Sequence, residues 1–295
     1  MLRSLTGAAL LLALLTPEVS ATTTATALSA SKASTAATRT PQAIATYCPR
    51  PLHRATRLII VTVPDMTSVK ATLHTFERKS PADATWRRSG PPEPAVVGSA
   101  GIGWSDPYVH LAKKDEPIKH EGDMRAPAGI FRVAGPFGFD KSTLAGYTKL
   151  VPGNSFCVDD ASSRYYGKII DKRLVKSVRS SEDMSAVPAL KRGMIVDYPA
   201  RRGTKAGSCV FIQIWDNDSA GTKARIGMAE DRLQVLQKWS AQGFTAIAIV
   251  TEAAASRFKG CLPINAASSK YEQPAVLPEP HPRRAPNQQH ADLVH

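Results

Sequence analysis

Short apolar runs rich in β-branched residues recur along the middle of the chain. Residues 57–63, 193–198, 208–215 and 244–250 are such runs, and Pro, Gly or Asp borders each of them on at least one side. Runs of this composition predict β-strands. Residues 69–78 alternate in part between apolar and polar side chains and predict a further strand. We therefore expect a mainly β protein.

One segment has a helical pattern instead. In residues 230–239, leucine and tryptophan recur at helical spacing, acidic residues occupy the first turn, and Gly243 follows as a stop signal. This pattern predicts an amphipathic helix whose apolar face packs on the core. A shorter helix is expected at residues 252–259. Residues 173–190 are interpreted as a linker with a helical turn that ends at Pro188.

The two ends of the chain differ in composition from its middle. Residues 1–21 combine the basic Arg3, an apolar run and a small-residue cleavage site, which predict a secretory signal peptide; the alternative is an uncleaved anchor. Residues 22–46 are rich in Thr, Ala and Ser, and residues 264–295 are proline-rich and polar, so both are expected to be disordered. Residues 47–263 are long enough for one folded domain.

Export gives the four cysteines an oxidising environment. An even number of cysteines in an exported chain favours disulfides. Of the three possible pairings, we favour Cys48–Cys261, which joins the edges of the domain, and Cys157–Cys209 in its interior; the alternative is free buried thiols. No cysteine or histidine spacing predicts a metal site. The expected location is periplasmic or secreted, with no transmembrane segment after signal cleavage.

The chain is strongly basic, with a formal net charge of +13 and a pI near 9.7. Such a charge suits the anionic surface of a cell envelope, and it is also found in nucleic-acid-binding proteins. The Lys and Arg residues, however, are scattered singly or in pairs, without a basic stripe that aromatic residues interrupt. We interpret them as solvated surface charge and expect no nucleic-acid partner.

Two segments resemble a known family. Residues 119–131 read KHEGDMRAPAGIF, and residues 207–228 read GSCVFIQIWDNDSAGTKARIGM. They are similar to the "EGD-K-TPAG-F" signature and to the active-site segment of the L,D-transpeptidases, cysteine enzymes that cross-link bacterial peptidoglycan. Residues 156–166 also resemble one branch of this family, and the resemblance covers about residues 48–263. It implies an L,D-transpeptidase-like β-sandwich with a few peripheral helices, and peptidoglycan as substrate or partner. No cofactor is expected.

The resemblance also locates the catalytic positions, and both carry other residues. Gln213 stands where the family has the histidine that serves as base. Arg225 stands where the family's Gly-Thr-x-Gly-Cys segment has its nucleophile; Gly221 and Thr222 match that segment, and Ala224 replaces its second glycine. An arginine is neither a nucleophile nor a base, and a glutamine amide does not titrate in the useful range. No catalytic pair is therefore intact.

The altered cleft suggests a binding site. With Lys223 beside it, the guanidinium of Arg225 is suited to hold a carboxylate of a peptide stem; the alternative is that Arg225 points to solvent. His120 is interpreted as a solvated loop histidine, with an acid–base role as the alternative. Cys209 is considered as a substitute nucleophile but is expected in a disulfide. The candidate ligand-binding residues are Gln213, Gly221, Thr222, Lys223, Arg225 and His120.

Three functions follow from these observations. The first is a catalytically inactive L,D-transpeptidase-like protein that binds peptidoglycan or its peptide stems, or modulates a cell-wall enzyme. The second is an active L,D-transpeptidase with an unorthodox nucleophile. The third is a basic exported interaction protein that retains only the scaffold. A reactive thiol would distinguish the second from the others, and binding to sacculi without covalent chemistry would distinguish the first.

Overall fold

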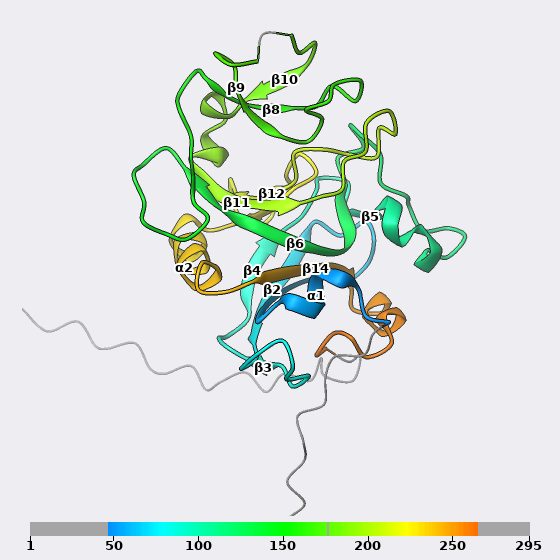
Figure 1. The fold of residues 1–295 in the computed structure, drawn as a ribbon. Helices are drawn as coiled ribbons and strands as arrows, with labels where there is room; N and C mark the ends of the chain where they lie inside the picture. The colour runs from blue at the N-terminus through cyan, green and yellow to red at the C-terminus, as the bar shows by residue number, and fades with distance from the viewer. Residues whose placement is uncertain (1–46, 176, 265–295) are drawn as a thin grey trace, which may run out of the picture. The chain divides into compact units, whose positions relative to one another are not determined.

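The computed structural model describes residues 47–175 and 177–264 (Figure 1). The predicted signal peptide, the predicted linker and all but the first residue of the predicted tail lie outside the described residues. No helix in the described part of the chain is long and apolar enough to cross a membrane.

Strands make up most of the regular structure, so the prediction of a mainly β fold with a few peripheral helices is confirmed. The strands are β1 (Arg57–Val63), β2 (Lys70–Glu77), β3 (Arg87–Arg88), β4 (Glu93–Val96), β5 (Ile102–Trp104), β6 (Ala126–Gly138), β7 (Thr148–Lys149), β8 (Ser155–Val158), β9 (Ile169–Asp171), β10 (Ser181–Asp183), β11 (Arg192–Asp197), β12 (Phe211–Ile214), β13 (Ile226–Met228) and β14 (Thr245–Thr251). The helices are α1 (Arg50–Arg54) and α2 (Glu230–Ser240), with 3₁₀ segments η1 (Asp106–Leu111), η2 (Met184–Ala186), η3 (Pro188–Leu190) and η4 (Ala254–Phe258).

The main sheet closes on itself. Its strands follow the order β1-β14-β6-β11-β12-β13-β4-β2, and β1 pairs with β2 as well as with β14. In β1, the residues from Leu58 to Val63 are buried, which explains its nearly continuous apolar run: a strand at the centre of a covered sheet has no solvent face. The largest apolar core packs around these strands.

A small second sheet, in the order β10-β8-β9, packs beside the main sheet and lies above β11 and β12 in Figure 1. A second apolar core joins the two sheets and includes Phe137 of β6, Cys157 of β8 and Phe211 of β12. The disulfide Cys157–Cys209 crosses this core, and Cys48–Cys261 joins α1 to the end of the described chain. These are the two pairings that the sequence favours.

Two segments differ from the expectation. Residues 173–190, interpreted as a linker, contain β10, η2 and η3. The sequence does not reveal β10 because it is a three-residue edge strand of polar side chains, without an apolar alternation. The strand expected at 208–215 is regular only from Phe211 to Ile214, because Cys209 has a φ of 50°, in the left-handed region. The short helix expected at 252–259 is the 3₁₀ segment η4.

The stability of the fold is expected to depend on His74 of β2. Its Nδ1 lies 2.8 Å from Arg88 Nη1, and its Nε2 lies 3.4 Å from Thr62 Oγ1. Burial, together with the charge of Arg88, lowers the pKa of His74 from 6.5 to about 4. The unfolded chain therefore takes up this proton at a higher pH than the folded chain does. The contribution of neutral His74 is complete above about pH 6.5 and is lost as the pH falls through about 4.

In the natural protein, protonation of His74 should lower the free energy of unfolding by about 2 kcal/mol as the pH falls between these two values, a figure reduced because the residue is partly exposed. The variant His74→Gln should not show this fall. Denaturant unfolding at both pH values measures the fall. His110→Gln, at an exposed position, is the control and should retain the wild-type pH dependence. The same dependence in wild type and His74→Gln would contradict the prediction.

Candidate functional site

Gln213 and Arg225, the two residues that the resemblance aligns with catalytic positions, lie next to each other. Gln213 is on β12, and Arg225 immediately precedes β13, which pairs with β12 in parallel so that Ile212 faces Ile226. Both residues are buried, at 7% and 6% exposure, and Arg225 Nη1 lies 3.4 Å from Gln213 Oε1. The fold thus brings Gln213 and Arg225, which are 12 positions apart in the sequence, into contact.

The guanidinium of Arg225 is fully engaged within the protein. Its Nε donates to the Cys209 carbonyl oxygen at 3.0 Å, and its Nη2 pairs with the carboxylate of Glu182 on β10. The charged group also lies over the ring of Phe211, 5.1 Å from its centroid. The carboxylate that Arg225 holds therefore comes from the chain's own small sheet. Sequence analysis missed Glu182 because it lies in the segment interpreted as a linker.

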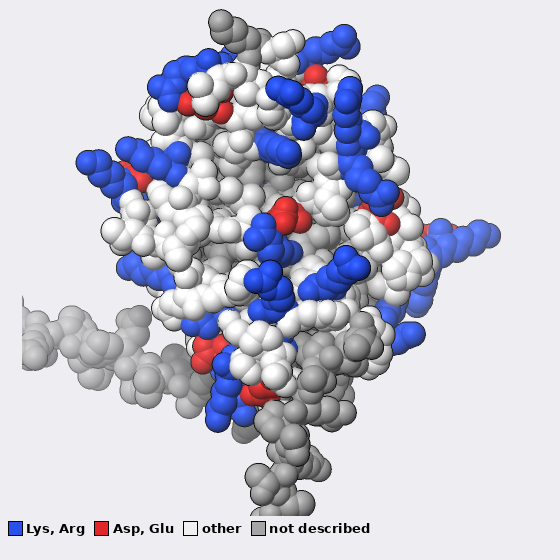
Figure 2. All heavy atoms as spheres, in the orientation of Figure 1, with Lys and Arg blue, Asp and Glu red and all other residues white. Residues whose placement is uncertain are grey.

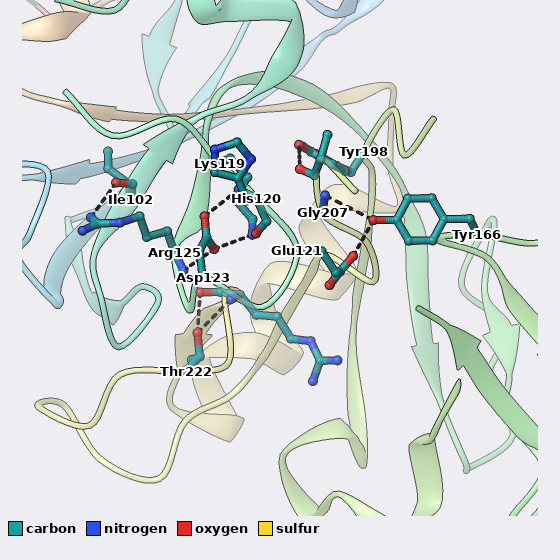
Figure 3. A network of polar contacts seen from close by, with 12 residues as sticks. Ile102, Lys119, His120, Glu121, Asp123, Arg125, Tyr166, Tyr198, Gly207 and Thr222 are labelled. Atoms are coloured by element: carbon teal, nitrogen blue, oxygen red, sulfur yellow. Dashed lines mark hydrogen bonds and ion pairs between the residues drawn. The ribbon is translucent and has the colours of Figure 1, made fainter. Parts of the chain in front are cut away.

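The remaining matches to the nucleophile segment have structural roles. Thr222 Oγ1 accepts from the Arg225 amide at 2.9 Å and donates to the Arg225 carbonyl oxygen at 2.6 Å, which fixes the turn (Figure 3). A Cβ on Gly221 would lie 2.4 Å from the Cα of Ser99, so no larger residue fits there. Lys223 is exposed at the tip of the turn. Gly221 and Thr222 thus shape the loop that presents residue 225.

The turn holds Ala224 in an unfavourable backbone conformation, with a φ of 60°. An L-residue in this left-handed region is strained, whereas glycine is not. We expect Ala224→Gly to raise the free energy of unfolding by about 0.5–1 kcal/mol. Ala253→Gly, at an exposed position with a φ of −67°, is the control and should lower it slightly. Denaturant unfolding of both variants tests this, and a loss of stability in Ala224→Gly would contradict it.

The loop of the "EGD" signature is held by its acidic residues (Figure 3). Asp123 Oδ1 accepts from the buried Nζ of Lys119 at 2.6 Å and from the Arg125 amide at 2.9 Å. Its Oδ2 accepts from the His120 amide at 2.6 Å, while the His120 residue is exposed. Arg125 in turn donates to the Met66 and Ile102 carbonyl oxygens. Asp123 is thus a structural residue of this loop.

Tyr166 ties this loop to the segment before β12, and Tyr198, which follows β11, holds that same segment. Tyr166 donates to Glu121 Oε2 at 2.5 Å and accepts from the Gly207 amide at 3.3 Å. Tyr198 donates to the Ala206 carbonyl oxygen at 2.7 Å. Burial, reinforced by the hydrogen bond to Glu121, raises the pKa of Tyr166, so the phenol stays protonated. The sequence placed Tyr166 in a region of resemblance but assigned it no contact, because Glu121 is 45 positions away.

No thiol is present at the site in the oxidised protein. The chain has four cysteines, and the two disulfides engage all of them. Cys209, the considered substitute nucleophile, is bonded to Cys157. Within residues 47–175 and 177–264, no group of three or more His, Cys, Asp or Glu side chains is arranged to hold a metal ion.

Comparison with known proteins does not identify a family. No protein-family model and no curated protein matches the sequence. Among solved structures, the chain is similar to the helical cell shape determining protein Pgp2 from Campylobacter jejuni, with 12% identity over 66% of this chain and 47% of that one, and a TM-score of 0.33. A mutant of Pgp2 matches with 13% identity over 68% and 56%, at the same TM-score. The chain spans about half the length of these proteins, and a likeness of this extent carries no conclusion about function.

Proposed function

We propose that this chain is an exported L,D-transpeptidase-like protein of the cell envelope that does not catalyse acyl transfer and that binds peptidoglycan or modulates its cross-linking. The signature segments of the sequence support the family. The predicted signal peptide and the two disulfides support export, since disulfides persist in oxidising compartments.

One observation carries the proposed loss of catalysis. The positions that the resemblance assigns to base and nucleophile hold Gln213 and Arg225, which contact each other and are buried. Acyl transfer by this family's mechanism requires a thiolate and a group that accepts its proton. The amide of Gln213 and the guanidinium of Arg225 supply neither. Glu182, the acidic group in contact with Arg225, neutralises the guanidinium charge.

The disulfides weigh against an active enzyme with a different thiol. Cys209 lies close to Arg225, the residue at the position that the resemblance assigns to the nucleophile, since the Cys209 carbonyl oxygen accepts from Arg225 Nε at 3.0 Å. Its sulfur atom, however, is bonded to Cys157. A sulfur in a disulfide cannot act as the attacking thiolate until it is reduced.

Co-sedimentation with purified sacculi tests the binding part of the proposal. We expect the mature protein to pellet with sacculi at low ionic strength and to be released intact by denaturant, without a covalent adduct. A basic protein of the same net charge and unrelated fold is the control, because it measures charge attraction alone. Pelleting no stronger than that of the control would contradict peptidoglycan binding and would favour a scaffold that binds another partner.

A further inference from the structure

A cavity of about 850 Å³ has neither Gln213 nor Arg225 in its wall. Its walls are the loop 140–147 after β6, Lys149 of β7, Arg192 at the start of β11 and the face of α2 at residues 234–238. In Figure 1 this loop lies beside α2 at the left of the molecule. Gln213, Cys209 and Glu182, which contact Arg225, do not line this cavity.

Positive charge dominates the wall of the cavity. Lys141, Lys149 and Lys238 are exposed, and within the described part of the chain none of them has an ion-pair or hydrogen-bond partner for its ammonium group. Arg192 adds a fourth cation, and Asp140 is the acidic residue of the wall. Figure 2 shows basic side chains gathered around an acidic one at the left edge of the molecule, on the side of α2. An anion is therefore the complementary occupant.

Hydrogen bonds fix two walls of the cavity. Gln237 of α2 is buried, and its Nε2 donates to the carbonyl oxygens of Phe137 at 3.1 Å and Gly193 at 2.8 Å. Tyr147 donates to the Asp140 carbonyl oxygen at 2.8 Å and so closes the loop. Walls held in this way are in place before a ligand arrives, which reduces the entropy lost on binding.

The available donors indicate the class of anion. Bidentate recognition of a carboxylate needs a free guanidinium fork, but Arg192 already pairs with Glu230 at 3.0 Å and with Asp140 at 3.6 Å. What remains is three flexible ammonium groups and the hydroxyls of Ser142 and Thr143. Single donors that approach from several directions suit a tetrahedral oxyanion, and lysine binds phosphate as a point charge. We propose that this cavity binds a phosphate-bearing ligand.

Calorimetric titration of the mature protein with pyrophosphate at low ionic strength tests the proposal. We expect saturable binding with one site per chain. The triple variant Lys141→Gln, Lys149→Gln, Lys238→Gln should weaken it about tenfold or more, because it removes three charges around one anion. The matched control is Lys70→Gln, Lys79→Gln, Lys113→Gln, which removes three exposed lysines from elsewhere and should change the affinity less than about twofold. The replaced side chains are exposed, so we expect both variants to fold. Melting temperatures equal to that of the natural protein would confirm it.

Three results would overturn the inference: no saturable binding by the natural protein, equal weakening in the two triple variants, or binding of the tricarboxylate citrate as tight as that of pyrophosphate. Amide shifts in a nitrogen-15 NMR titration locate the site independently. Shifts confined to the loop 140–147 and to α2 support the cavity, and shifts confined to other segments refute it. Failure here is separate from failure to bind sacculi, because pyrophosphate titration and co-sedimentation are independent measurements on the natural protein.

Discussion

Glu182→Ala is expected to lower the free energy of unfolding by about 3 kcal/mol. The substitution leaves the guanidinium of Arg225 without its counter-charge, in a position where only 7% of its side chain is exposed. Removing one partner of a buried ion pair typically costs about 3–5 kcal/mol, and we take the lower end because 21% of the Glu182 side chain is exposed. Denaturant unfolding of the mature protein measures the effect.

Two further variants separate the ion pair from other causes. Asp197→Ala breaks the exposed pair between Arg132 and Asp197 and should cost less than about 1 kcal/mol. The double variant Glu182→Leu, Arg225→Met replaces the buried pair with apolar groups and should be less destabilised than Glu182→Ala. If Glu182→Ala costs no more than Asp197→Ala, the ion pair does not hold the small sheet to the main sheet.

Removing the disulfide Cys48–Cys261 should have an effect of similar or larger size. It joins residues 213 positions apart, and its loss returns a large loop-closure entropy to the unfolded chain. We expect Cys48→Ala, Cys261→Ala to lower the free energy of unfolding by about 4–5 kcal/mol. Both cysteines are only 6% exposed, so part of the loss reflects the small cavities left by the sulfur atoms.

The effect of the disulfide is checked by denaturant unfolding of the double variant and of the reduced natural protein. The reduced protein should be less stable than the double variant, because reduction also breaks Cys157–Cys209, which the double variant keeps. A double variant as stable as the oxidised natural protein would show that α1 and the chain after η4 are held by packing alone.

The strands with strong apolar patterns could be predicted from the sequence. In the apolar run 208–215, alternation predicts that Val210 and Ile212 face one way and Cys209 and Phe211 the other, and the structure places these pairs in two different apolar cores. The pattern succeeds here because both faces of the strand are buried against distinct layers. The helix expected at 230–239 is α2 for the same reason, since Leu233 and Leu236 are buried on its inner face.

The contents of the site could be predicted only in part. The resemblance assigns Gln213 and Arg225 to the base and nucleophile positions of one site, and the structure shows that the two residues are in contact. The environment of Arg225 could not be predicted, because Glu182 lies 43 positions away on a polar strand of three residues. A contact between residues so far apart depends on how the two sheets pack, which hydrophobic periodicity along one segment does not encode. The same limit applies to Tyr166 and Glu121.

The central claim is that this protein does not catalyse acyl transfer, and muropeptide mass spectrometry of sacculi tests it most directly. Sacculi are incubated with the natural mature protein, with the variant Gln213→His, Arg225→Cys, and with an active L,D-transpeptidase as positive control. We expect the active enzyme to give exchanged stems and new L,D cross-links, and the natural protein to leave the muropeptide profile unchanged. New L,D cross-links or exchanged stems from the natural protein would contradict the account.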